Sequence, residues 1–267
     1  MTMSTAHRLI ITILVAASTS SLFAADVFTS EVRRYLSDAK SLAVSPLHWH
    51  RAEWTRFGEG TAAVLALYAA DKSLYDDVQR NRSSFTNNFA KDITPFGGHR
   101  ALELSVLMIA GGALAHQTET RDAGRDSLEA EFWAAGVVTP ILKRAFGRAR
   151  PSQDEGAHSF HSLSGSSRYE SFPSGHATNA FAFATAVAGH YDNWIVPTIV
   201  YTIASGVAFS RVNDRAHFPS DVLAGALIGR AVAKGILARH QHSRVAWSLA
   251  PGVIGDHPAL VVHLSAP

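Results

Sequence analysis

The residues best suited to chemistry lie between Ser210 and Asp221, where an arginine, a histidine and a carboxylate stand within twelve residues. The apolar run from Trp194 to Phe209 predicts a helix that ends near Ser210, and Pro219 fits the first turn of the next helix. His217 is then held just before a helix start, with Asp221 one turn away. A carboxylate there can accept one imidazole N–H and leave the other ring nitrogen free to attack or to move a proton.

Arg211 adds a planar fork of N–H donors that suits an oxyanion such as phosphate. By themselves, an arginine, a histidine and an aspartate at a loop–helix junction are more typical of a solvated helix cap with an ion pair. A functional site therefore needs further groups, and two other stretches of the chain supply them.

The first stretch, Lys143 to Pro151, holds four cations in eight residues at the end of a predicted helix. Lys143 and Arg150 are seven residues apart, so they can share one helix face, and Pro151 sets where the helix stops. The alternative is a solvated cationic last turn, which the helix dipole favours.

The second stretch, Ser171 to His176, opens a helix. Ser174 is a natural N-cap, and Gly175 lets an anion approach the backbone N–H groups of the helix start. His176 lies in the first turn, close to that anion site. The alternative is a capped helix with a surface histidine; a serine nucleophile is not indicated, because the chain has no G-x-S-x-G motif there.

In chain order the three stretches read K-x6-R-P, P-S-G-H and S-R-x5-H-x3-D. This set resembles the type 2 phosphatidate phosphatase superfamily, which includes bacterial non-specific acid phosphatases, lipid phosphate phosphatases and vanadium haloperoxidases. All three motifs are complete, and the likeness covers about residues 130–235. It implies an all-α fold, a single-domain helical bundle of the acid phosphatase and vanadium haloperoxidase type.

The resemblance also implies a role for each motif residue. His217 would attack phosphorus and form a phosphohistidine, with Asp221 orienting its ring. His176 would protonate the leaving oxygen and then activate water, duties that suit an unperturbed pKa near 6.5. The phosphoryl oxygens would be held by Lys143, Arg150, Ser174, Gly175 and Arg211. No cofactor and no metal is implied, because three cations neutralise the phosphate.

Composition excludes several other classes of protein. The 267 residues are 47% hydrophobic, enough for one sizeable core, and the formal charge of +2 gives no electrostatic case for nucleic acid. With no cysteine, a disulfide framework, a thiolate metal site and a cysteine nucleophile are all excluded. Fourteen histidines are spread along the chain. A metal site around His48, His50, His158 or His161 is the less favoured interpretation, and each of these four is expected to be a surface or supporting residue.

Hydrophobic patterning predicts helices almost throughout. The expected helices span Glu31–Ala43, Thr61–Ala70, Leu102–Ala115, Leu128–Phe146, Ser174–His190, Trp194–Phe209 and Pro219–Ala238. Asp71–Lys91 is expected to be a further helix or a long loop, Thr118–Ser127 a charged exposed segment, Val212–Ala216 a polar loop, and Ser152–Tyr169 a loop at the mouth of the site.

Both ends of the chain have a distinct character. Residues 1–25 resemble a secretory signal peptide, with an uncleaved anchor as the alternative, so we expect an exported protein, periplasmic or membrane-associated. A helical phosphatase domain is expected over 26–240. The tail, 241–267, contains two β-like pieces around Pro251-Gly252 that predict a small hairpin.

The location and the substrate stay open at this point. Small residues and short apolar runs favour burial in a soluble bundle, with a multi-span membrane protein as the competing interpretation. The expected substrate is a phosphomonoester, with a lipid phosphate as one possibility, and Trp49, Trp54 and Phe57 could contact a membrane surface. The alternatives are a vanadium-dependent haloperoxidase and a binding protein without turnover. The sequence does not indicate an oligomeric state.

Overall fold

The computed structural model describes residues 29–243, 246–254 and 257–265, in two compact units that divide after His48. In the first unit, residues 29–44 form a helix, followed by a 3-10 turn, η1 (Ser45–His48), in agreement with the helix predicted there. The predicted signal peptide over residues 1–25 lies outside the described residues.

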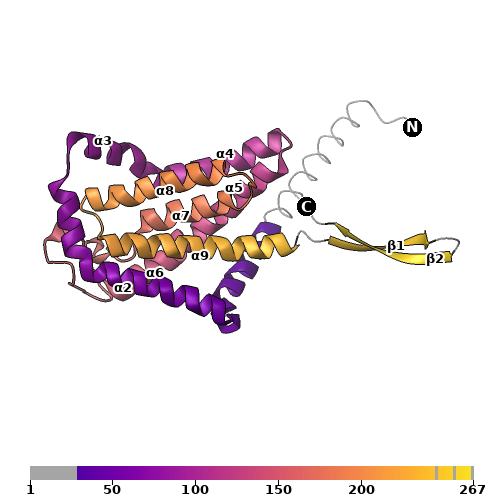
Figure 1. Cartoon of the computed structure of the whole chain (residues 1–267), viewed down its shortest axis with the longest axis horizontal. Helices are drawn as coiled ribbons and strands as arrows, with labels where there is room; N and C mark the ends of the chain where they lie inside the picture. The colour runs from indigo at the N-terminus through magenta and orange to yellow at the C-terminus, as the bar shows by residue number, and fades with distance from the viewer. Residues whose placement is uncertain (1–28, 244–245, 255–256, 266–267) are drawn as a thin grey trace, which may run out of the picture. The chain divides into compact units, whose positions relative to one another are not determined.

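The second unit is a helical bundle (Figure 1), which confirms the all-α class. Its α-helices are α2 (Arg51–Arg80), α3 (Ser84–Ile93), α4 (His99–Leu114), α5 (Thr118–Glu131), α6 (Thr139–Phe146), α7 (Gly175–Ala188), α8 (Ile195–Asn213) and α9 (Pro219–Ser243). A 3-10 turn, η2 (Thr94–Gly97), precedes α4, and a π-helical turn, η3 (Phe132–Val138), joins α5 to α6.

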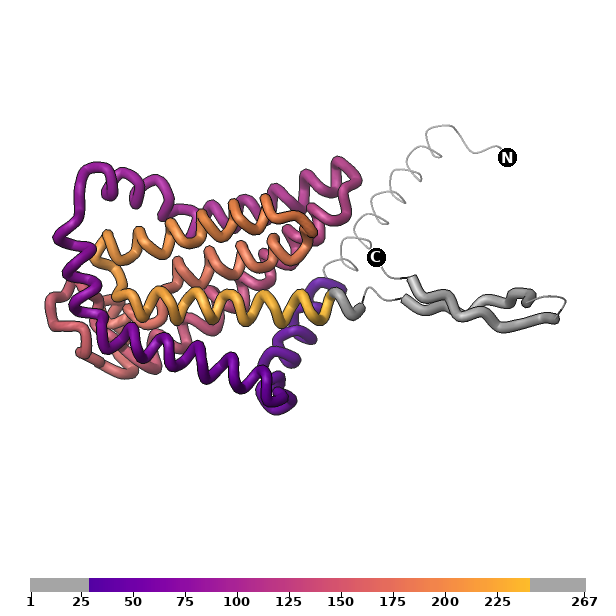
Figure 2. Tube along the Cα trace, in the orientation of Figure 1, coloured from indigo at the N-terminus to yellow at the C-terminus, as the bar shows by residue number. Residues whose placement is uncertain are grey.

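Helix α7 lies in the middle of this bundle and packs against α5, α8 and α9 (Figure 2). Its small residues let the neighbouring backbones come close. A Cβ added to Gly229 of α9 would lie 2.2 Å from the Thr178 carbonyl oxygen of α7, and one added to Gly225 would lie 2.5 Å from the Ser174 carbonyl oxygen. This close contact fixes the start of α7 against the start of α9, where two of the three motifs lie.

Two of the predicted element boundaries differ from those in the structure. The segments Thr61–Ala70 and Asp71–Lys91 are not separate, since α2 runs unbroken through Asp71, whose buried carboxylate is paired with Arg148. Helix α8 continues past Phe209 to Asn213, so part of the predicted polar loop is helical.

The predicted charged and exposed segment Thr118–Ser127 belongs instead to α5, and its last part is buried. Asp126 is only 3% exposed because two histidines bond to its carboxylate, His190 at 2.9 Å and His240 at 2.7 Å. Burial alone raises the pKa of Asp126, but the hydrogen bonds from these two rings hold it well below its ordinary value. The polar segment is thus buried through contacts with residues that are distant in sequence, which the sequence pattern does not show.

The C-terminal hairpin predicted from the sequence is present, with longer strands than expected. Strand β1 (Ala246–Ile254) pairs antiparallel with β2 (His257–Ser265). Pro251 and Gly252 were expected between the strands but lie inside β1, where Pro251 is opposite Leu260. A proline is tolerated there because both strands of a two-stranded sheet are edge strands.

Candidate active site

All three sequence motifs meet at one end of the bundle, the left-hand end in Figure 1. The loop after α6, the start of α7 and the α8–α9 junction come together there. Direct backbone hydrogen bonds tie them: the Ser174 N–H donates to the Asp221 carbonyl at 2.9 Å, and the Ser171 N–H to the Arg148 carbonyl at 3.0 Å. Residues more than seventy positions apart in sequence therefore share one site.

His217 is buried and held in one orientation. Its Nδ1 lies 2.7 Å from the Ser171 carbonyl oxygen and 3.8 Å from the Asp221 carboxylate. A carbonyl can only accept, so Nδ1 carries the proton and Nε2 keeps its lone pair. Burial, together with the charges of Lys143 and Arg150, lowers the pKa of His217 to about 3, against the opposing effect of Asp221. The ring is thus neutral and fixed over the ordinary pH range, which is the state that a histidine nucleophile needs.

The hydrogen-bond partners of Asp221 differ from the direct contact with His217 that the sequence predicts. Its carboxylate lies beyond hydrogen-bond distance of the His217 ring and accepts instead from the Ser171 hydroxyl at 2.6 Å, the Phe218 N–H at 2.8 Å and Arg148 at 2.5 Å. Burial by itself raises the pKa of Asp221, and the surrounding donors and the Arg148 charge hold it below its ordinary value. Asp221 therefore positions His217 indirectly, through Ser171 and the backbone at Phe218.

Arg148 is the residue of this site that sequence reasoning missed. It lies among the six variable positions between Lys143 and Arg150, and its side chain is only 1% exposed. It bonds Asp71 of α2 at 2.7 Å and Asp221 of α9 at 2.5 Å, and its guanidinium carbon lies 4.5 Å from the centre of the Phe218 ring. One buried cation thus joins α2 to two of the motifs, and nothing in its spacing distinguishes it from a solvated arginine.

Lys143 and Arg150 do not share a helix face, contrary to the expectation. Helix α6 ends at Phe146, and Gly147 takes a left-handed conformation with φ of 60°. A Cβ there would lie 2.0 Å from the His161 carbonyl oxygen, so only glycine fits. Arg150 instead follows the helix in an extended segment, where its N–H donates to the Arg168 carbonyl at 3.0 Å.

The two cations are nevertheless close enough to affect each other. Burial, and then the positive charge of Arg150, lower the pKa of Lys143 to about 8. Lys143 donates to the Glu170 carbonyl, and Arg150 Nε donates to the Ser167 carbonyl at 3.0 Å. Backbone carbonyls of the loop therefore hold both cations without neutralising them, which leaves their charge available to an anion.

Arg211 supplies the third cation. Its NH1 lies 3.3 Å from the Thr94 hydroxyl and 3.4 Å from the Asp214 carboxylate. Its Nε is buried and, within the described part of the chain, has no hydrogen-bond partner. A buried donor without a partner is costly unless a ligand satisfies it, so this atom is suited to a phosphoryl oxygen.

His176 and the start of α7 complete the site. Ser174 is the N-cap of α7, and its hydroxyl accepts from the Ala177 N–H at 3.5 Å. Gly175 packs beside Lys143, since a Cβ added there would lie 3.8 Å from Lys143 Cε. Burial, followed by the charges of Arg211, Lys143 and Arg150, lowers the pKa of His176 to about 4. Lys143 and Arg150 therefore lower the pKa of both imidazoles. The start of α7, which carries His176, is bonded to the start of α9 beside His217 through the Ser174 N–H and the Asp221 carbonyl.

A fourth segment, Thr94–Gly98, also borders the site, although no motif includes it. The Ser210 hydroxyl donates its proton to the Val207 carbonyl at 2.7 Å. In the 2.7 Å bond between Thr94 and Ser210, the Thr94 hydroxyl is therefore the donor. The Thr94 oxygen in turn accepts a hydrogen bond from Arg211. A Cβ added to Gly97 would lie 2.7 Å from the His176 carbonyl oxygen. In the sequence, Pro95 and the pair Gly97-Gly98 indicate no more than a turn here.

The loop predicted at the mouth of the site has its own internal contacts. His161 Nε2 lies 2.8 Å from the Glu155 carboxylate, and its ring centre lies 3.9 Å from that of Tyr169. The ring of His158 packs at 4.5 Å from that of Tyr68 on α2. Both histidines therefore support the loop, as expected from the sequence.

Comparison with known proteins agrees with this geometry. Residues 132–244 match the PAP2 superfamily, a region that contains every motif residue. The motif-bearing part of this chain is therefore similar to the PAP2 superfamily. It is 45% identical over 97 residues to a lipid A 1-phosphatase of Rhizobium johnstonii, covering 36% of this chain and 39% of that protein. It is 32% identical over 129 residues to a probable diacylglycerol pyrophosphate phosphatase of Schizosaccharomyces pombe, covering 37% of this chain and 46% of that protein.

Two solved structures have a fold similar to that of this chain. The crystal structure of Aquifex aeolicus LpxE matches with a TM-score of 0.51 and 22% identity, over 63% of this chain and 95% of that one. A transmembrane PAP2 type phosphatidylglycerolphosphate phosphatase from Bacillus subtilis matches with a TM-score of 0.54 and 25% identity, over 69% of this chain and 95% of that one. The curated relatives are matched over less than half of their length, whereas these two structures are matched almost completely.

Proposed function

We propose that this protein is a membrane-associated phosphatase that hydrolyses lipid phosphate monoesters through a phosphohistidine intermediate. One observation carries the proposal: His217 presents an unprotonated Nε2 where the three motif segments meet, and Lys143 and Arg150 lower the pKa of both His217 and His176. A nucleophile, a proton donor and a cationic binding site for the phosphoryl oxygens are then present together.

The residues account for each step of hydrolysis. His217 Nε2 attacks phosphorus, and the bond from phosphorus to the leaving oxygen breaks as His176 gives that oxygen a proton. Water then attacks the phosphohistidine while His176 takes a proton from it, which releases phosphate and restores His217. Lys143, Arg150 and Arg211 stabilise the equatorial oxygens during both transfers. These three cations do the neutralising, so we propose that no metal is required.

A neutral His176 has to gain the proton that it donates. Burial, and then the charges of Arg211, Lys143 and Arg150, lower the pKa of His176 to about 4. A phosphate dianion bound among these cations would offset their charges and raise it. A phosphate monoester, with a second pKa near 6, brings that negative charge. Binding of the phosphate would therefore also raise the pKa of the general acid, His176, so that it can carry the proton that it donates.

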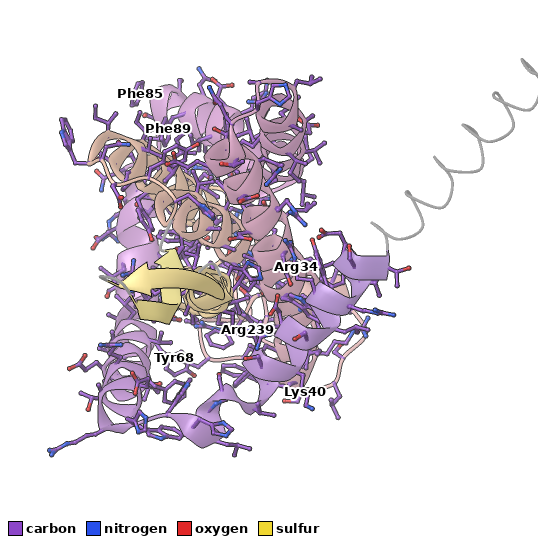
Figure 3. All side chains as sticks on the ribbon, turned by 90° about the vertical axis from the view of Figure 1, so that its right-hand side faces the viewer. Arg34, Lys40, Tyr68, Phe85, Phe89 and Arg239 are labelled. Carbon is purple, nitrogen blue, oxygen red and sulfur yellow. The ribbon has the colours of Figure 1, made fainter. Side chains whose placement is uncertain are left out.

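Exposed apolar side chains support a membrane location. The sequence favoured burial of the helices in a soluble bundle, but α4, α8 and α3 leave large apolar residues exposed: Leu102, Val106, Leu107, Leu114, Ile195, Ile199, Phe209, Phe85 and Phe89. Figure 3 shows the last two projecting from α3. In the described part of the chain one helix, α8, is long and apolar enough to cross a membrane, with a mean hydropathy of 1.4 and 22% of that stretch buried. Apolar surface of this extent is typical of lipid contact.

The aromatic residues noted in the sequence lie at the start of α2. The ring centres of Trp49 and Trp54 are 5.0 Å apart, those of Trp54 and Phe57 are 5.9 Å apart, and Trp54 and Phe57 are 50% and 55% exposed. A half-exposed aromatic cluster suits the boundary between lipid and water. We propose that it contacts the membrane surface. Export by an N-terminal signal over 1–25, ahead of a phosphatase domain over 26–240, remains part of the proposal.

A substrate panel tests the function. The purified full chain in detergent, with EDTA present, would be assayed with p-nitrophenyl phosphate, phosphatidate and a lipid A phosphate. We expect metal-independent release of phosphate, highest with a lipid, and its loss in His217→Ala while the folded helical signal is retained. Turnover by a folded His217→Ala protein close to that of the unmodified protein would refute the nucleophile, and release that stops with EDTA would refute the metal-independent mechanism.

A further inference from the structure

A buried carboxyl group, that of Glu131, lies outside the three motifs and takes no part in the steps proposed above. Glu131 is the last residue of α5, is 2% exposed, and directly precedes the π-helical turn η3. Turns of this kind are rare and often occur at functional sites. Burial of a carboxyl group is unfavourable unless the group is neutral or well paired, so its neighbours indicate what it does.

The hydrogen bonds around Glu131 are complete when its carboxyl group is protonated. Ser105 Oγ lies 2.7 Å from Glu131 Oε1 and 2.8 Å from Ser127 Oγ. The Ser127 hydroxyl also donates to the Gly124 carbonyl at 3.0 Å. Two hydroxyl protons cannot serve these three bonds, whereas a protonated Glu131 supplies the third proton by donating to Ser105. Burial likewise raises the pKa of Glu131 to about 7, against the opposing effect of hydrogen bonds from Ser105 and Asn179.

Asn179 connects this carboxyl group to the turn beside the active site. It lies on α7, is 7% exposed, and its Nδ2 donates to the Gly98 carbonyl at 3.3 Å. A side-chain amide has a second N–H, and Asn179 is close enough to Glu131 to lower the pKa of the carboxyl group. Among the residues that the structure describes, the buried Oε2 of Glu131 has no hydrogen-bond partner of normal geometry. It is therefore the acceptor suited to the second N–H of Asn179.

Gly98 in turn lies against the ring of His176. A Cβ added to Gly98 would lie 3.7 Å from His176 Nε2 and 4.0 Å from its Cδ2. Asn179 stands three residues after His176, so both side chains project from the same side of α7. Within the described part of the chain no hydrogen bond contributes to the pKa of His176, so the orientation of its ring depends on packing against neighbours such as Gly98.

We propose that Glu131 and Asn179 are positioning residues for His176. The inference rests on the proposed phosphatase function, in which His176 protonates the leaving oxygen. The carboxyl group orients the Asn179 amide, the amide holds the Gly98 carbonyl, and the Gly98 backbone keeps the imidazole in place for proton transfer. Neither side chain belongs to the proposed set of phosphate-binding groups, so the affinity for phosphate should not depend on them.

The test uses the dependence of the reaction on its leaving group. An alkyl phosphate needs a proton on its leaving oxygen, whereas p-nitrophenolate is stable enough to leave without one. Asn179→Leu would be assayed in the purified full chain with hexyl phosphate and with p-nitrophenyl phosphate, at about pH 6, where Glu131 is protonated. We expect kcat/KM to fall about tenfold on the alkyl ester, part of the roughly 10²–10⁴-fold that general acid catalysis contributes, and about twofold or less on the aryl ester. The inhibition constant of phosphate should not change.

Two variants of Glu131 separate hydrogen bonding from size. Glu131→Gln keeps a donor for Ser105 and an acceptor for Asn179, so the ratio of the two kcat/KM values should stay close to that of the unmodified chain. Glu131→Leu keeps neither and should resemble Asn179→Leu. The matched control is Thr185→Val, which removes another buried hydrogen bond of α7, 2.9 Å long, to the Tyr201 hydroxyl. It should lower the thermal unfolding midpoint and leave the ratio unchanged.

The outcomes distinguish this inference from the proposed function. Equal losses on both esters in Asn179→Leu, or a ratio that Glu131→Leu does not change, would overturn the positioning role. A loss in Glu131→Gln as large as that in Glu131→Leu would overturn the role of the neutral carboxyl group. His176→Ala is the reference, and an unchanged ratio in that variant would overturn the general acid and this inference with it. Absence of hydrolysis of both esters by the unmodified chain would overturn the phosphatase itself.

Discussion

Replacing Arg148 with methionine should destabilise the whole bundle, because this buried cation neutralises two buried carboxylates. Asp71 and Asp221 are each fully buried and lie 2.7 Å and 2.5 Å from the guanidinium. Methionine fills much of the volume but leaves both carboxylates without their counter-charge. Breaking one buried ion pair by removing a partner costs about 3–5 kcal/mol.

That cost is large against the stability of an ordinary domain, about 5–15 kcal/mol. We therefore expect Arg148→Met to lose at least about a fifth of the free energy of unfolding, measured by urea denaturation in detergent. Catalysis should fall as well, since Asp221 holds Ser171, whose carbonyl fixes the tautomer of His217.

Two controls separate this argument from a general effect of removing charge. Arg144→Met removes an exposed cation from the same stretch and should change the unfolding free energy by less than about 0.5 kcal/mol. Adding Asp71→Asn to Arg148→Met should recover part of the loss, because one of the two stranded charges is removed. An Arg148→Met protein as stable as the unmodified one would show that the two carboxylates do not depend on this cation.

Three further predictions concern the site itself. Thr94→Val should raise the inhibition constant of phosphate several-fold without changing the unfolding midpoint, because it removes the hydroxyl that holds Arg211; an unchanged constant would contradict the positioning role. Since the pKa of Lys143 is lowered to about 8, the lysine loses its charge as pH rises through that value, so kcat/KM should fall there. Lys143→Arg should move this alkaline limb upward, and a limb that stays in place would assign it to another group. Gly97→Ala should lower kcat by displacing His176, whose carbonyl oxygen would lie 2.7 Å from the new methyl group, with activity and thermal unfolding as the paired measurements.

The sequence predicts the motif residues themselves, but few of the contacts that hold these residues in place. Lys143, His176, Arg211 and His217 carry their chemistry in their residue types, and the order of the motifs is enough to recognise the superfamily. The all-helical class follows from patterning, because long apolar periodic segments without strand signals leave few alternatives.

The supporting contacts could not be predicted in the same way, since they join segments far apart in sequence. Arg148 looks like any cation near a helix end until Asp71, seventy-seven residues away, is placed against it. The Thr94–Gly98 turn looks like a connection until it is seen beside Arg211 and His176. The apolar faces of α4 and α8 resemble core faces in sequence, and only the packing of the described residues shows that Leu107, Leu114 and Ile199 stay exposed.

Burial, and in addition the cations proposed to bind the substrate, keep both imidazoles of this site neutral, and this has a consequence for the proposed catalysis. A neutral His217 is ready to attack at any ordinary pH, but a neutral His176 cannot protonate the leaving oxygen. The two requirements are met in sequence only if the anion arrives first, offsets the charge of Arg211, Lys143 and Arg150, and so raises the pKa of His176 next to the scissile bond. His217 is less affected by the anion, because burial dominates its shift and its Nδ1 proton is already committed to Ser171. The different burial of the two rings is thus what the proposed division of roles rests on, with His217 attacking phosphorus and His176 transferring the proton.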